Sequence, residues 1–235
     1  MNPHSGDGSG VDELRAAAAA RGLDTHLLRP GEDATTLARG ARAEALGCAG
    51  GDGTFAAVAA VAIERGLPFV CVPFGTRNHF ARDLGLDRAD PIAALDAFGG
   101  TERRIDVGRA NGRLFLNNVS IGAYAVLVHR GWRRVLDALR LRHRLTVDGD
   151  ALRTRVLLIA NNAYSLSGAR DRLDEGRLHL YTPRGEIRVA SRVVVGARSR
   201  NLRTAVDGER AVFETPLELA IEPGALRVLV PPRDV

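Results

Sequence analysis

The spacing of apolar residues changes near residue 104 of this 235-residue chain, and the change limits the folds open to it. Before it, short apolar strands alternate with helical segments, an order that predicts a parallel sheet with helices on both faces. After it, one short strand follows another between turn pairs such as Asn111-Gly112, which predicts mostly antiparallel β structure. The sequence therefore predicts two domains, residues 1–103 and 104–235, with no long linker.

Periodicity and turn residues assign the individual elements. In the first half we expect helices over residues 11–21, 34–45, 56–65 and 89–98, and strands over residues 26–28, 47–49 and 67–72. In the second half we expect strands over residues 105–107, 114–120, 145–147, 155–160, 178–182, 187–195, 203–206, 217–221 and 225–230. One helix, over residues 131–144, interrupts these strands; its apolar face carries Trp132 and its other faces carry arginines. Such a helix either packs on a sheet or lies on an anionic membrane.

The chain opens on a polar, glycine-rich loop over residues 2–10. Loops of this kind usually follow a buried strand at its carboxyl end, and no such strand precedes this one. We therefore expect that the start has been assigned too late, that the sequence is a piece of a longer one, or that the sheet does without this strand.

The basic residues limit the chemistry, because all 33 are arginine and the chain has no lysine. This excludes Schiff-base enzymes and the Walker A phosphate loop, so backbone N–H groups, a metal ion or arginine must hold any bound phosphate. Residues 104–235 contain 23 arginines and residues 1–103 contain 10, while each part has 14 acidic residues. The basic second half suggests an anionic partner, and we rank a membrane surface above nucleic acid because aromatic residues are only 5% of the chain. A solvated basic surface without a partner is the alternative.

Cysteine content and hydropathy indicate the compartment. Cys48 and Cys71 lie in apolar contexts, which predicts neither a disulfide framework nor a metal site. No apolar run approaches the roughly 18 residues of a membrane-spanning helix. These features predict a cytoplasmic protein.

Two glycine loops follow the expected strands of the first half. We call residues 50–54 (Gly-Gly-Asp-Gly-Thr) the first glycine loop and residues 74–78 (Phe-Gly-Thr-Arg-Asn) the second. Because the carboxyl ends of parallel strands share one edge of a sheet, we expect both loops to converge there, with backbone N–H groups free to approach phosphate. Each loop can equally be a tight turn with a capping residue. The Asp-Gly pairs at residues 148–149 and 207–208 are likewise most simply read as turns.

Taken together, these stretches resemble the diacylglycerol kinase catalytic family, which includes bacterial diacylglycerol kinases and sphingosine kinases. The matching stretches, in family order, are Asn2-Pro3-x-Ser5-Gly6, both glycine loops with the continuation Phe80-Ala81-Arg82, Ile105-Asp106-Val107-Gly108, Asn117-Asn118-Val119-Ser120-Ile121-Gly122, Asp174-Glu175-Gly176, Asp207-Gly208-Glu209 and Pro223-Gly224-Ala225-Leu226-Arg227-Val228. Each stretch alone is weak evidence, but the order covers essentially the whole chain.

The resemblance implies an N-terminal α/β nucleotide-binding domain like that of NAD kinase and phosphofructokinase, a C-terminal β-sandwich, and an active site in the cleft between them. It implies an ATP-dependent lipid kinase that transfers the γ-phosphoryl group to a hydroxyl of diacylglycerol or a related lipid. The partners implied are ATP and a lipid at the inner membrane face, where the protein would bind peripherally.

The resemblance also assigns roles to residues. The nucleotide-binding residues would be Asn2, Ser5, Gly50, Gly51, Asp52, Gly53, Thr54, Gly75, Thr76 and Asn78. Asp207 would be the general base, with Glu209 beside it. Asp52 and Asp106 would hold the catalytic Mg²⁺, and a structural Mg²⁺ would bind the Glu175 side chain and the carbonyl groups of Arg172 and Arg177.

Three positions depart from the family pattern: His79 replaces a usual aspartate, Ala57 a glutamate, and Glu175 an aspartate. Because a neutral imidazole is a poor Mg²⁺ ligand, His79 either contacts phosphate or changes how the metal is used. These departures leave two alternatives open, a nucleotide kinase like NAD kinase and a catalytically impaired protein that binds nucleotide or lipid.

Overall fold

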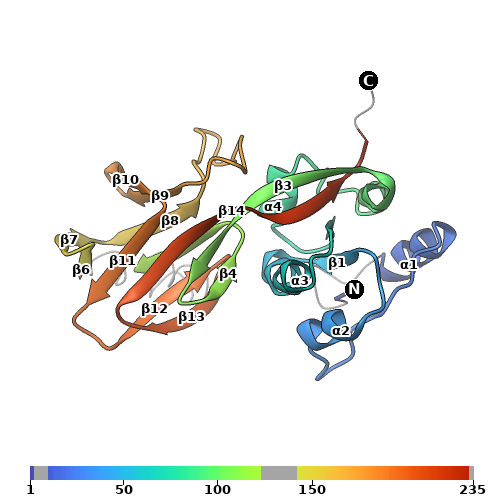
Figure 1. Cartoon of the computed structure of the whole chain (residues 1–235), viewed down its shortest axis with the longest axis horizontal. Coiled ribbons are helices and arrows are strands. Elements are labelled where there is room, and N and C mark those ends of the chain that lie inside the picture. The colour runs from blue at the N-terminus through green and yellow to red at the C-terminus, as the bar shows by residue number, and fades with distance from the viewer. Residues whose placement is uncertain (3–9, 123–141, 233–235) are drawn as a thin grey trace. The chain divides into compact units, whose positions relative to one another are not determined.

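The computed structural model describes residues 1–2, 10–122 and 142–232 (Figure 1). The chain forms two compact units, the first comprising Met1–Ile105 with Gly224–Val235 and the second Asp106–Pro223. The division thus falls two residues after the predicted boundary, and the last twelve residues return to the first unit. They return because the end of the last strand pairs with a strand of the first unit.

The first unit is an α/β domain. Its strands are β1 (Leu46–Gly50), β2 (Phe69–Pro73) and the end of β14 (Leu217–Val230), and its helices are α1 (Val11–Ala20), α2 (Ala34–Gly40), α3 (Asp52–Arg65), α4 (His79–Asp83) and the 3₁₀ helix η1 (Ala93–Gly99). Strand β2 pairs in parallel with β1 on one side and β14 on the other. The predicted parallel sheet is therefore confirmed.

Apolar residues cover both faces of this sheet. On one face, Leu14 and Ala18 of α1 pack with Val70 of β2 and with the buried residues of η1. Elsewhere the rings of Phe55 (α3), Phe69 (β2) and Phe80 (α4) form a triangle with centroids 6.3–6.4 Å apart. Since these rings tie α3 and α4 to β2, they fix the two helices that follow the glycine loops.

Several predicted elements of this unit need correction. Residues 26–28 are not a strand, because among the described residues their backbone forms hydrogen bonds with Met1 alone. Helix α2 ends at Gly40 rather than at residue 45, and α3 begins at Asp52, four residues before its predicted start. The helix predicted over residues 89–98 is the shorter η1, since the α conformation is disfavoured just before Pro91. Helix α4 was not predicted.

The second unit consists of two antiparallel sheets. One has the order β10-β9-β8-β5-β12-β13, and the other joins β7, β6, β11 and the start of β14, with β3 and β4 alongside β14. Their bounds are β3 Thr101–Ala110, β4 Arg113–Phe115, β5 Asn118–Gly122, β6 His143–Val147, β7 Asp150–Thr154, β8 Val156–Asn161, β9 Leu178–Thr182, β10 Gly185–Ala190, β11 Arg192–Ala197, β12 Asn201–Val206 and β13 Glu209–Glu214. One apolar core includes Ile121 and Ile159 from the first sheet and Val193 and Leu219 from the second. The predicted β-sandwich is confirmed.

Corrections in this unit concern where strands divide. The strand predicted over residues 114–120 is two strands, β4 and β5, and that over residues 187–195 is β10 and β11. By contrast, the strands predicted over residues 217–221 and 225–230 are the single strand β14, and β7 and β13 were not predicted. The helix predicted over residues 131–144 lies mostly outside the described residues, but its last two residues, His143 and Arg144, belong to β6.

Both Asp-Gly pairs are turns, as predicted. Asp148-Gly149 links β6 to β7 and Asp207-Gly208 links β12 to β13. In each pair both residues have positive φ, 49° and 91° in the first and 48° and 86° in the second. These values are typical of type I′ hairpin turns, which explains aspartate followed by glycine.

Candidate active site

The two glycine loops of the first unit lie against each other, as predicted. They follow β1 and β2, whose register pairs Gly50 with Pro73, and the Phe74 N–H donates to the Gly50 carbonyl at 3.0 Å. A Cβ atom on Gly75 would lie 2.7 Å from the Gly51 Cα, so only glycine permits this approach. The loops therefore form one surface of closely packed backbone beside the start of α3.

The start of α3 has no side-chain cap, because Gly51 occupies the N-cap position in an extended conformation. Asp52 is the first helical residue, and Gly53 and Thr54 complete the first turn. N–H groups at such a helix start carry partial positive charge and lack partners within the helix. This end of the first unit is suited to an anion such as phosphate.

The buried side chain of Asn78 holds the second glycine loop in shape. Its Oδ1 accepts the Gly75 N–H at 3.2 Å, and its Nδ2 donates to the Gly75 carbonyl at 2.7 Å. The backbone of Asn78 has φ 47°, a left-handed conformation that asparagine tolerates. Asn78 therefore fixes the conformation of the second glycine loop.

Asp52 links the first glycine loop to α4. Its carboxylate is buried, and its two oxygens accept the N–H groups of His79 at 3.1 Å and Phe80 at 2.9 Å. These are the first two residues of α4, so Asp52 caps that helix from a distant part of the chain. Asp52 therefore has a structural role that the sequence did not indicate.

The remaining predicted nucleotide residues of this unit lie as follows. Asn2 is partly buried, and its Nδ2 donates to Thr54 Oγ1 at 3.4 Å. Thr76 and its neighbour Arg77 are exposed in the second glycine loop. Ser5 lies outside the described residues.

His79, the replacement for the usual aspartate, is half-buried beside Asp52. Burial lowers the pKa of its imidazole, and the negative charge of Asp52 opposes that shift in part. The ring is therefore favoured in its neutral form. A neutral ring does not replace the charge of a carboxylate at this position.

Asp207 in the second unit has its carboxylate surrounded by backbone donors. Its Oδ2 accepts the Leu116 N–H at 2.7 Å, and its Oδ1 accepts the N–H groups of Asn117 at 2.7 Å and Asn118 at 3.0 Å. Three N–H donors favour a negatively charged carboxylate and fix its orientation. Glu209 is exposed and faces Arg113 at 3.3 Å.

A buried arginine holds the same connector between β4 and β5 from another side. Arg170 is 2% exposed and donates to the carbonyl groups of Leu116 at 2.6 Å and Asn161 at 3.0 Å, and to Asn117 Oδ1 at 2.6 Å. Asn161 adds bonds from its Nδ2 to the carbonyl groups of Leu116 and Asp106. Sequence reasoning missed Arg170, since one arginine among 33 carries no signal.

Asp106 contacts the loop over residues 172–177, and Glu175 lies within this loop. Asp106 Oδ2 accepts the Gly176 N–H at 2.6 Å, and the Asp106 N–H donates to the Leu173 carbonyl at 2.7 Å. Glu175 Oε2 accepts the Ala163 N–H at 3.0 Å and lies 3.2 Å from His179 Nε2, close enough for an ion pair but outside hydrogen-bond geometry.

The two arginines predicted to supply metal-binding carbonyls lie in this loop as well. The Arg177 carbonyl accepts the Asn162 N–H at 2.9 Å, and the Arg172 side chain pairs with Asp174 at 3.2 Å. Within the described part of the chain, no cluster of three or more His, Cys, Asp or Glu side chains is arranged to hold a metal. A metal in this loop would therefore need carbonyl or amide oxygens or water beside any single carboxylate such as that of Glu175.

The free cysteines, Cys48 and Cys71, are buried and face each other across β1 and β2. Burial raises the pKa of the Cys48 thiol to about 12 and that of Cys71 well above its ordinary value. Neither is a nucleophile at neutral pH.

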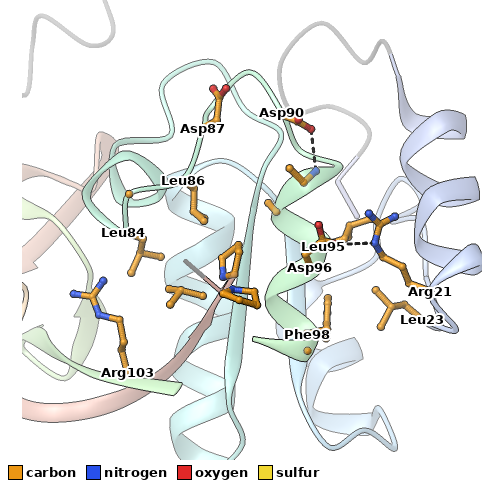
Figure 2. A pocket seen from close by; sticks show the side chains of 17 residues that line it. Arg21, Leu23, Leu84, Leu86, Asp87, Asp90, Leu95, Asp96, Phe98 and Arg103 are labelled. Carbon is orange, nitrogen blue, oxygen red and sulfur yellow. Dashed lines mark hydrogen bonds and ion pairs between the residues drawn. The ribbon is translucent and has the colours of Figure 1, made fainter. Parts of the chain in front are cut away.

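A pocket of about 950 Å³ in the first unit contains none of the predicted site residues (Figure 2). Apolar residues such as Leu84, Leu95 and Phe98 line it together with acidic residues. Two of the acids are already engaged, since Asp96 pairs with Arg21 at 2.8 Å and Asp90 caps the Ala93 N–H at 2.9 Å.

None of the helices within the described ranges combines the length and the apolar character needed to span a bilayer.

Comparison with known proteins identifies relatives of both the sequence and the fold. Residues 1–110 match the diacylglycerol kinase catalytic domain family. A Pseudomonas aeruginosa protein named "Probable lipid kinase YegS-like" is 39% identical over 127 residues, which are 50% of this chain and 42% of that protein. The diacylglycerol kinase of Bacillus subtilis is 34% identical over 111 residues, 45% of this chain and 37% of the relative. The matches thus span about two fifths of the curated relatives' length.

The fold likeness extends over nearly the whole chain. A crystal structure of a diacylglycerol kinase from Bacillus anthracis strain Sterne aligns with 97% of this chain and 94% of its own, with a TM-score of 0.72 and 19% identity. A second structure from the same bacterium gives a TM-score of 0.75 at 20% identity. The predicted resemblance and the predicted fold class are both confirmed.

Proposed function

We propose, from the match of residues 1–110 to the diacylglycerol kinase catalytic domain family, that the chain is an ATP-dependent lipid kinase. The γ-phosphoryl group of ATP passes to a hydroxyl of diacylglycerol or a related lipid. The observation that carries the proposal is the contact between the two glycine loops beside the uncapped start of α3.

The loops support binding of the ATP phosphates. Because Gly51 and Gly75 have no side chains, their backbone leaves room for phosphate oxygens to reach N–H groups. Asn78 and Asp52 hold the loops in one geometry before ligand arrives, which lowers the entropic cost of binding. Thr76 is exposed and free to turn its hydroxyl toward a phosphate or a ribose.

Asp207 is the proposed general base for the lipid hydroxyl. Backbone N–H groups of residues 116–118 hold both of its oxygens in place. The carboxylate is fixed by its donors, and in the proposed reaction it orients the attacking hydroxyl and accepts its proton. Glu209, the first residue of β13, follows Asp207 by two residues and adds a second negative charge close to it in the sequence.

The residues present suit a hard cation such as Mg²⁺. Asp52 and Asp106 offer carboxylate oxygens, the ligand type that Mg²⁺ prefers. Around Glu175, the amide side chain of Asn162 is fully buried, and neither of its polar atoms has a hydrogen-bond partner in the structure. The Asn162 N–H binds the Arg177 carbonyl, so the backbone of Asn162 adjoins the loop that contains Glu175 and Arg172. When bound, Mg²⁺ offsets negative charge on the transferred phosphoryl group and stabilises this loop.

The charge distribution supports a substrate at a membrane surface. Residues 104–235, with 23 arginines against 14 acids, carry the positive charge that anionic lipid headgroups attract. We therefore place the protein in the cytoplasm, in peripheral contact with the inner membrane face.

Phosphate transfer from labelled ATP tests the proposal. The chain is incubated with ATP, Mg²⁺ and vesicles containing diacylglycerol, and in a parallel reaction with NAD in place of lipid. Labelled lipid is the expected product. Labelled NAD phosphate would instead indicate a nucleotide kinase, and ATP binding without transfer to either acceptor would indicate a binding protein.

The base is tested separately, because Asp207 also holds the β4–β5 connector. Asp207→Asn is compared with Asn117→Ala, which removes a side-chain acceptor of Arg170 in the same connector but leaves the carboxylate in place. If Asp207 is the base, Asp207→Asn abolishes transfer at every pH while ATP binding persists, whereas Asn117→Ala retains transfer. Full activity of a folded Asp207→Asn protein would remove Asp207 from the proposal.

A further inference from the structure

The hairpin formed by β6 and β7 in the second unit carries a pair of like charges on its surface. Its register places Arg144 of β6 directly opposite Arg153 of β7, so their Cβ atoms lie on one face about 5 Å apart. Both side chains are exposed. Arg142 and Arg155, each just outside the paired segments, are exposed as well. We call these four residues the arginine ribbon.

The paired arginines lie on the outer face of their sheet. Leu145, Val147 and Leu152, their neighbours along the two strands, pack into the core of the β-sandwich. Because side chains alternate between the two faces of a strand, Arg144 and Arg153 point away from that core. Strand β7 is the last strand of this sheet, so the ribbon lies at the sheet edge (Figure 1). A partner as large as a membrane can therefore reach it.

The ribbon has no acidic partner. Within residues 10–122 and 142–232, no carboxylate forms an ion pair with any of its four arginines. The two acids of the hairpin itself, Asp148 and Asp150, both bind Arg188 of β10 instead. Their negative charge is therefore already engaged.

Other arginines of the same sheet do have acidic partners. Arg192 of β11 pairs with Glu218 of β14, and Arg109 of β3 pairs with Glu222 at 3.1 Å. Like charges placed directly opposite each other on adjacent strands destabilise a sheet. The hairpin keeps such a pair without a carboxylate to offset it, and a bound anion would supply the missing charge.

The chemistry of this face favours phosphate groups on a flat surface over nucleic acid. Thr146 and Ala151, the next opposed pair on the same face, have short side chains that leave the arginines accessible. Residues 142–155 contain no Asn or Gln to read a base edge and no Phe, Tyr or Trp to stack on a base. The ribbon thus offers contacts to phosphate alone.

Two arginines side by side match a phosphate monoester better than a diester. A monoester carries about −1.5 to −2 charge near neutral pH and presents three free oxygens, whereas a diester carries a single charge. Each guanidinium group can bind two phosphate oxygens in a fork. The opposed pair of Arg144 and Arg153 therefore offers two positive charges to one dianionic group.

We propose that the arginine ribbon docks the protein on membranes that contain lipid phosphate monoesters. The inference rests on the proposed function, because the product of that reaction is a phosphate monoester of a lipid. Each turnover converts an uncharged lipid hydroxyl into a dianionic headgroup. A membrane on which the protein has acted consequently retains it more strongly, and the product promotes further turnover on the same membrane.

Sedimentation with vesicles tests the docking surface without ATP or turnover. Phosphatidylcholine vesicles contain either phosphatidic acid, a monoester, or phosphatidylglycerol, a diester, in amounts adjusted to the same zeta potential. The unaltered chain is expected to bind the phosphatidic acid vesicles more tightly. Equal binding to the two kinds of vesicle would overturn the assigned preference for monoesters.

A double variant, Arg144→Gln with Arg153→Gln, locates the surface. Binding to phosphatidic acid vesicles is expected to weaken about 30-fold, at about 1 kcal/mol for each arginine. The thermal midpoint is not expected to fall, because the change removes a like-charge pair. The matched control is Arg184→Gln with Arg203→Gln, which removes two exposed arginines of the β9–β10 turn and β12. Equal weakening by the control would show that overall charge, and not the ribbon, drives binding.

The geometry of the guanidinium groups is tested by Arg144→Lys with Arg153→Lys. Lysine keeps the charge but loses the fork, so binding to phosphatidylglycerol vesicles should persist while the preference for phosphatidic acid disappears. Soluble glycerol 3-phosphate should compete weakly, because it lacks the array of headgroups. Competition as strong as that of vesicles would indicate a small-molecule site, and tighter retention by duplex DNA would indicate a nucleic-acid surface; either result would overturn the proposal.

The two proposals fail in different ways. Labelled lipid product together with sedimentation that ignores the ribbon would overturn this inference alone. Sedimentation that depends on the ribbon, without phosphate transfer to lipid, would overturn the proposed function and the feedback while leaving the docking surface in place.

Discussion

Asp52 in the first unit and Asp207 in the second perform the same structural task in different settings. Both are buried carboxylates that accept backbone N–H groups from a segment far away in the chain. Asp52 accepts two, from the start of α4, whereas Asp207 accepts three, from the connector between β4 and β5. Asp52 lies in a helix, whereas Asp207 lies in a turn with positive φ.

The difference shows how each unit fixes its proposed functional loop. In the first unit, the close contact between the two glycine loops and the side chains of Asp52 and Asn78 together fix the loop conformation. In the second, Arg170 and Asp207 hold the connector at residues 116–118: Arg170 binds the Leu116 carbonyl and the Asn117 side chain, and Asp207 binds the backbone N–H groups. We infer that the second unit depends more on single charged side chains than the first.

Asp207→Ala should therefore be the most destabilising of the four changes considered. It leaves three backbone N–H groups without their acceptor, and each costs about 1–3 kcal/mol when buried. We expect the free energy of unfolding in urea to fall by about 3–5 kcal/mol. Asp148→Ala is the matched control, because it has a similar φ in the equivalent turn, and among the described residues its carboxylate accepts one backbone N–H group, that of Val194, beside its ion pair with Arg188. Equal losses from both variants would show that turn strain, not the N–H groups, sets the cost.

Gly75→Ala tests the contact between the glycine loops and should have the next largest effect. The added Cβ would lie 2.7 Å from the Gly51 Cα, and backbone cannot move aside as a flexible side chain can. We expect a loss of about 1–3 kcal/mol of unfolding free energy and weaker ATP binding, measured by urea unfolding and calorimetry. Gly51→Ala is the control for stability, since its Cβ would meet only the Gly75 Cα at an ordinary 3.8 Å. If the two variants are equally stable, the close approach does not constrain the loops.

Asp52→Asn should have a smaller effect. The amide oxygen of asparagine can still accept one of the two N–H groups, so only one bond to α4 is lost. We expect a loss of about 1–2 kcal/mol in urea unfolding and faster hydrogen exchange at the start of α4. Asp33→Asn, at the N-cap of α2, should change stability very little because aspartate and asparagine cap equally well. A loss at Asp52 exceeding that of Asp207→Ala would reverse our ranking of the two units.

The sequence predicted those parts of the fold that depend on residues close together in the chain, and it missed parts that depend on distant residues. The β/α alternation, the parallel pairing of β1 with β2 and both Asp-Gly turns depend on neighbouring residues and were predicted correctly. The single strand β14 was split in the prediction because Pro223-Gly224 is a typical turn signal. Helix α4 was missed because its cap, Asp52, lies 26 residues ahead of Asn78 in the sequence. Such a cap exists only once the sheet has brought the loops together.

The candidate site divides in the same way. The contact of the glycine loops could be predicted, because strand order determines where loops meet. The bonds of Asp207 to residues 116–118 could not, since nothing in a sequence shows which backbone N–H groups a distant carboxylate will accept. Arg170 was not predicted for a different reason. Its burial in the folded structure distinguishes it from the other arginines, whereas its position in the sequence does not.

The smallest expected effect is on the pH dependence of stability, through the pKa of His79 beside Asp52. Burial lowers the pKa of His79, so the folded state favours the neutral ring, and the unfolded state binds the proton more tightly. This contribution to stability is present above the unfolded pKa of about 6.5 and is lost as pH falls below it toward the folded value. His79→Gln should therefore flatten the decline in thermal midpoint between about pH 7 and pH 5.

Because the Asp52 charge opposes the shift, Asp52→Asn should lower the pKa of His79 further in an NMR titration, while the pKa of His143, lowered by burial alone, stays unchanged. A His79 pKa that does not respond to Asp52→Asn would mean that the helix start and the imidazole are held independently.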